Sequence, residues 1–204
     1  MPAGASNFGT LVYDDDAYMR GSKASITVPS GQAPDNNQAV AHRVGNEQNG
    51  SSHAIQAGIY RTTNLRVSCG TSENGWHKYS EQYENGIYAC HEYGSATAGN
   101  EVDFSVSRTD VDGQWRVKIL GAVKDTYDLG YGQGYSYMGS EINSETASTS
   151  GAVDIRYCDD VSWKVFDGTF ESSPVTVTSN SQWFAASGAG WTFGNFPCGV
   201  RFQH

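Results

Sequence analysis

A carboxamide and a carboxylate stand in similar surroundings in two separated segments of the sequence. Gln56 is followed at alternate positions by a glycine and a tyrosine, and Glu141 is preceded at alternate positions by a glycine and a tyrosine. Successive side chains of a strand point to opposite faces, so each trio shares one face of its strand. If the two strands lie side by side, they present an amide and an acid to one groove lined by aromatic rings.

Three other kinds of site are less well supported. The five histidines and many serines are not accompanied by the G-x-S-x-G turn of a serine hydrolase. Residues 14–16 and 110–113 supply acidic oxygens, but neither continues into an EF-hand calcium loop, and Asp-x-Asp-Gly is typical of a turn. Residues 101–105 resemble the E-x-D-x-E strand of the laminarinase-type sandwich enzymes, with a serine in place of the last acid. We therefore expect no metal and no cofactor.

The elements that must position these residues are strands. Apolar residues alternate along the chain instead of recurring every three or four positions, so no segment predicts a helix. The Asn85-Gly86 dipeptide predicts a hairpin, and residues 110–113 predict a second one. We expect strands at residues 24–28, 55–60, 78–83, 87–93, 102–106, 115–119, 135–142, 153–157, 162–166, 175–178 and 190–193, and loops at 31–50 and 124–134.

This many short strands in a chain of 204 residues predicts an all-β fold. No change of composition marks a domain boundary, so we expect one domain over residues 1–204, with residues 1–23 as an N-terminal extension or strand. The expected architecture is a single-domain antiparallel two-sheet β-sandwich of the concanavalin-like or jelly-roll kind. No apolar run approaches the roughly 20 residues that a membrane span needs.

The cysteine pattern predicts disulfides. The four cysteines include no C-x-x-C pair, which favours two disulfides over a metal site: Cys69, Cys90, Cys158 and Cys198. Three pairings are possible. A turn signal at residues 72–75 favours Cys69–Cys90, which leaves Cys158–Cys198 to hold the C-terminal part. Disulfides form in oxidising compartments, so we expect a secreted protein whose export signal has been removed.

Charge and aromatic content bear on the partners. The formal net charge is −9, without a basic stripe, so a nucleic acid is not expected as a partner. Tyr127, Tyr131, Tyr135 and Tyr137 stand close together in the sequence with interleaved glycines. Such tyrosines could form a platform on which sugar rings or a partner protein stack. The alternative is that they only pack against one another across neighbouring strands. A protein or a polysaccharide is therefore the expected ligand, and nothing indicates the oligomeric state.

An ordered series of short motifs resembles the glutamic peptidases of the eqolisin type. Residues 40–45 are similar to that family's W-V-G-I strand, and residues 55–59 to the I-L-Q-x-G-V strand that carries its catalytic glutamine. Residues 79–86 stand where the family has Y-E-W-Y-P. Residues 98–106 are similar to its A-G-D-x-I-x-V-x-V turn and strand, and Glu141 falls where its catalytic glutamate is expected.

The resemblance implies a sandwich of two curved antiparallel sheets with Gln56 and Glu141 on the concave face. It implies an endopeptidase that hydrolyses peptide bonds at acidic pH. Glu141 would take a proton from the attacking water and return it to the leaving amine, while the Gln56 amide donates to the oxyanion. The expected substrate-binding tyrosines are Tyr60, Tyr79, Tyr83 and Tyr137. The alternative is a secreted module without catalysis that binds carbohydrate or a partner protein on the same face, in some cases within a larger assembly.

Overall fold

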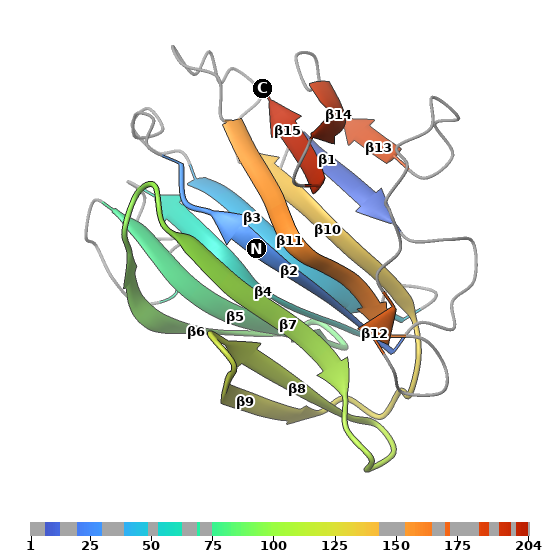
Figure 1. Cartoon of the computed structure of the whole chain (residues 1–204). Coiled ribbons are helices and arrows are strands. Elements are labelled where there is room, and N and C mark those ends of the chain that lie inside the picture. Colours follow the sequence, from blue (N-terminus) through green and yellow to red (C-terminus); the bar gives the residue numbers. More distant parts are fainter. Residues whose placement is uncertain are drawn as a thin grey trace.

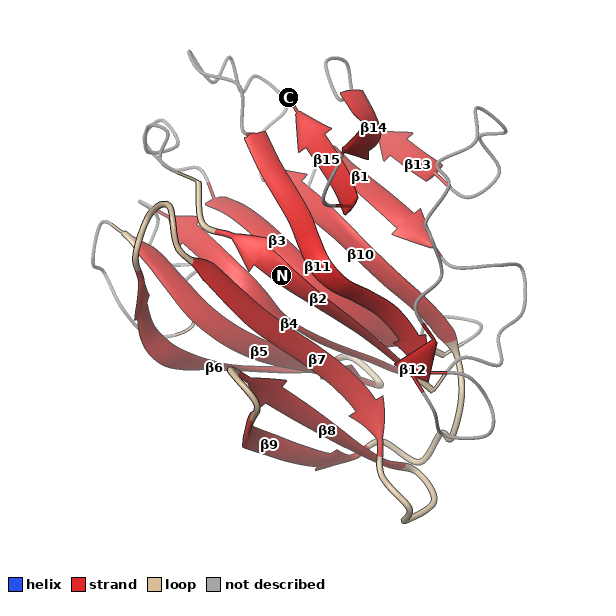
Figure 2. Cartoon of the chain, in the orientation of Figure 1, coloured by secondary structure: helices blue, strands red, loops and turns tan. Residues whose placement is uncertain are grey.

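The structure is a computed structural model of the whole chain. It describes residues 7–12, 20–29, 39–48, 53–62, 69, 75–142, 154–164, 170–171, 184–187, 192–196 and 199–203. All regular elements among these residues are strands, as Figure 2 shows. The alternating apolar pattern is the reason, because it gives each segment one buried face at a period of two residues.

The strands form two antiparallel sheets that are stacked face to face (Figure 1). The seven-stranded sheet has the order β13 (Phe184–Ser187), β1 (Asn7–Val12), β10 (Tyr135–Ile142), β3 (Ala39–Glu47), β4 (His53–Thr62), β5 (Trp76–Glu84) and β6 (Ile87–Ala96). The eight-stranded sheet has the order β14 (Thr192–Phe196), β15 (Gly199–Gln203), β11 (Asp154–Lys164), β2 (Gly21–Thr27), β7 (Glu101–Arg108), β8 (Gln114–Ile119) and β9 (Ala122–Asp128), and β12 (Phe170–Glu171) pairs with β11. The predicted all-β antiparallel sandwich is confirmed.

The core lies between the two sheets. In β7 the apolar side chains Val102, Phe104 and Val106 are buried, and in β8 the same holds for every second residue from Trp115 to Ile119. Facing them, β4 contributes Ile55, Ala57 and Ile59, none of which is exposed to solvent. Each of these strands thus buries its apolar face, and removal of this apolar surface from water stabilises the fold.

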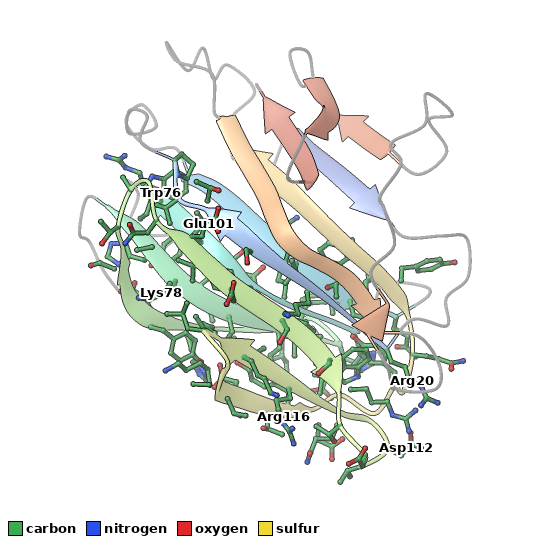
Figure 3. All side chains as sticks on the ribbon, in the orientation of Figure 1. Arg20, Trp76, Lys78, Glu101, Asp112 and Arg116 are labelled. Carbon is green, nitrogen blue, oxygen red and sulfur yellow. A yellow bond between two sulfur atoms is a disulfide. The ribbon has the colours of Figure 1, made fainter. Side chains whose placement is uncertain are left out.

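The predicted hairpins are present. Asn85 and Gly86 connect β5 to β6 with φ angles of 46° and 89°. Two consecutive positive φ angles define the turn type whose twist matches a β-hairpin, and Asn-Gly is the pair that adopts it most readily. The turn between β7 and β8 contains Gly113 at a φ of 72°. Figure 3 shows Arg20 and Asp112 at one end of the sandwich and Trp76 and Glu101 at the other.

Three predicted boundaries were wrong. Residues 39–47, predicted as loop, form the central strand β3, because Ala41 and Val44 are buried although charged residues flank them. The predicted loop at 124–134 begins inside β9. The two strands predicted at 153–157 and 162–166 are one long strand, β11, with an irregular register against β2 between Cys158 and Ser162. The strand predicted at 175–178 lies outside the described residues.

The predicted Cys69–Cys90 disulfide is present. It ties Cys69, which precedes β5, to the middle of β6, and it packs against Ala41, Tyr60 and Tyr79. The second predicted disulfide involves Cys198, which lies outside the described residues, and stays a prediction. The backbone of Cys158 pairs with Gly199, the residue that follows Cys198.

The described part of the chain contains no helix with the length and hydropathy of a membrane span.

Candidate functional site

The two faces of the seven-stranded sheet can be told apart by Ser80. Its hydroxyl contacts Asp125 and Tyr127 of β9, so Ser80 points toward the eight-stranded sheet. Ser80 pairs in register with Ala57, which therefore points the same way. Side chains alternate along β4, so Gln56 lies on the opposite side. We call that side the outer face; within the described strands it is the face turned away from the eight-stranded sheet.

A short row of residues crosses the outer face at Gln56. Tyr137 of β10 pairs with Gly45 of β3, and Gly45 pairs with Gln56 of β4. The Tyr137 hydroxyl passes over Gly45 and donates a hydrogen bond of 2.7 Å to Oε1 of Gln56. A Cβ atom at Gly45 would lie 2.6 Å from that hydroxyl oxygen. Glycine is therefore what lets the two side chains meet across the intervening strand.

The same row continues with an acid. Gln56 pairs in register with Glu81 of β5, whose side chain is on the outer face as well. Glu81 is 3% exposed and accepts a hydrogen bond from the Tyr88 hydroxyl of β6. An amide and a carboxylate thus stand on directly opposite positions of two neighbouring strands, each held by a tyrosine hydroxyl.

Glu141 is not in this row. Its backbone pairs with Ala41, four residues along β3 from Gly45, and β3 separates β10 from β4. With about 3.3 Å per residue and about 4.8 Å between strands, the Cα atoms of Glu141 and Gln56 are about 16 Å apart. The Glu141 side chain lies outside what the structure describes, so the catalytic pairing stays a prediction. The register gives Gln56 two closer partners, Tyr137 and Glu81.

Next to this row, the outer face holds a buried polar cluster. The Tyr60 hydroxyl donates to Glu92 at 2.6 Å, and Nδ1 of His77 lies 3.0 Å from the other oxygen of the same carboxylate. The backbone N–H of Cys69 donates to the Tyr60 hydroxyl at 3.3 Å. The Tyr79 ring packs edge-on against Tyr60 with 5.4 Å between ring centroids. The disulfide therefore holds Cys69 against this cluster.

The predicted substrate-binding tyrosines differ in exposure. The sequence predicted that Gln56 and its neighbours point into an open groove, but Gln56, Tyr60, Tyr79 and Tyr137 are all less than 9% exposed. The rings and polar groups cover one another, which removes most of the predicted opening. Tyr83 is different, because it is 40% exposed.

One end of the outer face stays open. Tyr83 belongs to a row that also contains Tyr135, Glu47, Ala54 and Tyr88, and no member of this row is fully buried. Burial raises the pKa of the Glu47 carboxyl above its usual range, and the nearby Arg43 charge opposes this shift without cancelling it. The open row is therefore acidic and aromatic.

Several residues of the site were missed in the sequence. Glu92 lies in no motif, and Gly45 and Glu81 were noted only as members of the motifs at residues 40–45 and 79–86, because their roles depend on which strands become neighbours. A signal was present in residues 77–83, where the alternate positions 77, 79, 81 and 83 are His, Tyr, Glu and Tyr. Read as a strand, it puts four large polar side chains on one face.

In the described part of the chain, no three His, Cys, Asp or Glu residues are placed to hold a metal ion.

Known structures share this architecture. A scytalido-glutamic peptidase solved with a peptide-based transition state analogue superposes with a TM-score of 0.61 at 13% identity, over 97% of both chains. SCP-B, a member of the eqolisin family of peptidases solved with the tripeptide Ala-Ile-His, gives 0.59 at 12% identity over 97% of both chains. A second scytalido-glutamic peptidase structure, with a transition state analog inhibitor, gives 0.58 at 15% identity over 98% of both.

The chain has the fold of the eqolisin glutamic peptidases. The resemblance inferred from the short motifs is thereby confirmed for the concanavalin-like β-sandwich. At these identities the likeness concerns the fold and not the chemistry. No protein-family model matches the sequence, and no curated protein matches it.

Proposed function

We propose that this protein is a secreted peptide-binding module built on the glutamic-peptidase fold, which holds an extended peptide on its outer face without hydrolysing it. The observation that carries the proposal is the Tyr137–Gln56 hydrogen bond of 2.7 Å across Gly45. A tyrosine, which is a poor base at acidic or neutral pH, stands where a carboxylate would meet the amide.

The burial of the row supports binding over catalysis. A general base has to reach the attacking water directly or through one other water. Glu81 is the carboxylate nearest to Gln56 in register, but it is 3% exposed and already accepts the Tyr88 hydroxyl. Exposed aromatic side chains begin at Tyr83, at the open end of the face. Side chains on a rigid sheet at that end suit recognition.

A peptide is favoured as the ligand by the fold. The similar structures include a glutamic peptidase with a peptide-based analogue and SCP-B with a bound tripeptide. A polysaccharide is the other ligand class that aromatic platforms bind, and it serves as a competing outcome.

The test is a binding measurement with the intact protein. An unstructured, uncharged peptide and a neutral oligosaccharide are titrated separately while the tyrosine fluorescence and the NMR spectrum are followed. Binding of the peptide, with perturbed Tyr83 signals and no cleavage products by mass spectrometry, supports the proposal. Binding of the oligosaccharide alone, or no binding, contradicts it.

A second candidate function is the glutamic endopeptidase with Gln56 and Glu141. The similarity to peptidases over 97% of the chain favours it. In that case Glu141 activates water and Gln56 donates to the oxyanion, which requires the segment around Glu141 to shift toward the row of Gln56. Digestion of an unfolded protein at acidic pH, abolished in a Glu141→Gln variant, would establish it. Digestion that is absent, or unchanged in the variant, would rule it out.

A further inference from the structure

An alanine separates an acid from an exposed tyrosine at the open end of the outer face. Glu47 of β3 pairs in register with Ala54 of β4, and Ala54 pairs with Tyr83 of β5. The three side chains therefore stand in one row on the outer face. Neighbouring strands lie about 4.8 Å apart, so the Cα atoms of Glu47 and Tyr83 are about 10 Å apart, with only the methyl group of Ala54 between them.

This row can be reached from solvent. Tyr83 is 40% exposed, and Glu47 and Ala54 are partly exposed. The next row along the strands is different, because Gln56 and Glu81 are buried there. A ligand side chain that lies over Ala54 would therefore have the Glu47 carboxylate on one side and the Tyr83 ring on the other.

The Glu47 carboxylate has lost hydration without gaining an ion pair. Within the described residues, no hydrogen bond or ion pair joins this carboxylate to another side chain. Arg43 is on the same face, but it lies four residues along β3, which places its Cα atom about 13 Å away. Burial raises the pKa of the Glu47 carboxyl, and the Arg43 charge does not cancel this shift. A cation that binds beside such a carboxylate stabilises its ionised form.

The surroundings of Glu47 have the charge that attracts a cation. The other charged residue in this row and the next is also an acid, Glu81, and the chain as a whole has a formal net charge of −9. The face of an aromatic ring such as that of Tyr83 attracts cations as well. A carboxylate and a tyrosine on either side of a methyl group are therefore complementary to a side chain that has an apolar stem and a cationic head.

We propose that the outer face recognises an extended peptide that carries a basic residue, whose apolar stem lies over Ala54 beside the Tyr83 ring and whose cationic head pairs with the Glu47 carboxylate. This inference rests on the peptide-binding function proposed above and names the class of peptide. Lysine and arginine both suit the row, because their stems pack against apolar groups while their heads donate hydrogen bonds to carboxylates.

The test compares two otherwise uncharged peptides that differ at one central residue, which is lysine in one and Nε-acetyl-lysine in the other. Acetylation keeps the stem and removes the charge. At about 0.15 M salt, which screens distant charges, we expect the lysine peptide to bind about tenfold more tightly. Glu47→Gln keeps the shape of the side chain and removes its charge, so it should bring the two affinities together. Tyr83→Ala should weaken the binding of both peptides, because the ring contacts the stem in each.

The matched control is Glu84→Gln. Glu84 follows Tyr83 in β5 and points to the opposite side of the sheet, so this variant removes the same charge from the same end without touching the proposed contact. The tenfold ratio should survive in it. Equal affinity of the wild type for the two peptides, a preference that survives Glu47→Gln, or an equal loss in both variants overturns the inference and leaves peptide binding in place.

Two further outcomes concern the proposed function itself. Failure of both peptides to bind the wild type overturns peptide binding together with the basic-residue preference. Binding of a cationic glucosamine oligosaccharide in place of both peptides, abolished in Glu47→Gln, would overturn both as well and would assign the row to a sugar.

Discussion

Tyr137 and Gln56 form a hydrogen bond of 2.7 Å although they belong to strands that are not neighbours. The strand between them carries Gly45 at the crossing point, and a side chain there would collide with the tyrosine. The bond is accepted by the oxygen of the Gln56 side-chain amide. This contact therefore places the Tyr137 hydroxyl beside the Gln56 amide and fixes the orientation of that amide.

The glycine at the crossing point should be intolerant of substitution. In Gly45→Ala, the new Cβ would lie 2.5 Å from Cζ of Tyr137 and 2.8 Å from the carbonyl oxygen of Ile55. Overpacking of this kind costs about 1–3 kcal/mol of unfolding free energy. Chemical denaturation measures the loss. The control is Gly75→Ala, where the nearest atom to a new Cβ is 3.7 Å away, and there the change should stay within about 0.5 kcal/mol. Equal effects at both glycines would contradict the crossing geometry.

The Glu47 carboxyl should make stability depend on pH. Burial raises its pKa in the folded state, whereas in the unfolded chain it ionises near the ordinary value of about 4.3. Just above that value the folded state binds more protons than the unfolded state, so stability falls as pH rises through this window. Relative to Glu47→Gln, the wild type should therefore lose stability between acidic and near-neutral pH.

Urea denaturation of the wild type and Glu47→Gln at a series of pH values checks this dependence. Glu101→Gln is the control, because Glu101 is exposed at the start of β7. Parallel pH profiles for wild type and Glu47→Gln, or a wild type that gains on the variant as pH rises, would show that burial of Glu47 is not the dominant effect.

Removal of the disulfide should destabilise the chain by about 3 kcal/mol. Cys69 and Cys90 are separated by 21 positions, and the closure entropy of a loop of that length has about this value in the unfolded state. The double variant Cys69→Ser, Cys90→Ser also loosens the contact of Cys69 with Tyr60. Thermal unfolding with and without reductant measures the effect. A wild type that is equally stable in both conditions would contradict it.

Asp125 of β9 should stabilise the contact of its sheet with strands β5 and β6 of the other sheet. It accepts hydrogen bonds from Ser80 of β5 and Tyr93 of β6, and Nδ1 of His91 lies 3.2 Å from its other oxygen. Asp125→Asn replaces one acceptor oxygen by a donor, so we expect a loss of about 1.5–3 kcal/mol, the range for hydrogen bonds to charged groups. Asp128→Asn, at an exposed position of the same strand, is the control and should change stability little. Similar losses in both variants would contradict the role of Asp125.

The strands and their faces were predictable because they depend on local alternation. Residues 135–142 were predicted as a strand with the observed ends, and the strand predicted at residues 55–60 lies within β4. The Asn85-Gly86 turn was likewise a local inference, and so was the Cys69–Cys90 pairing, which followed from the turn signal at residues 72–75 between the two cysteines. These features need only the period of the pattern and the chemistry of the turn.

The partners of each side chain were not predictable in the same way. The sequence indicated that Gln56 and Glu141 share a face, but the register of β3 decides who meets whom, and it aligns Gln56 with Tyr137. In the sheet β3 lies between β4 and β10, and neither of those two segments contains a sequence feature that indicates this. The segment of β3 was itself predicted as loop because of its polar composition. It forms a strand because pairing and packing with its neighbours outweigh that local preference.

The most direct test of the account is incubation of the intact protein with an unstructured, uncharged peptide from acidic to neutral pH, followed by NMR of the tyrosines and mass spectrometry of the peptide. We predict that the signals of Tyr83 shift on addition of the peptide and that the peptide stays intact. Cleavage of the peptide that disappears in Glu141→Gln would contradict the account.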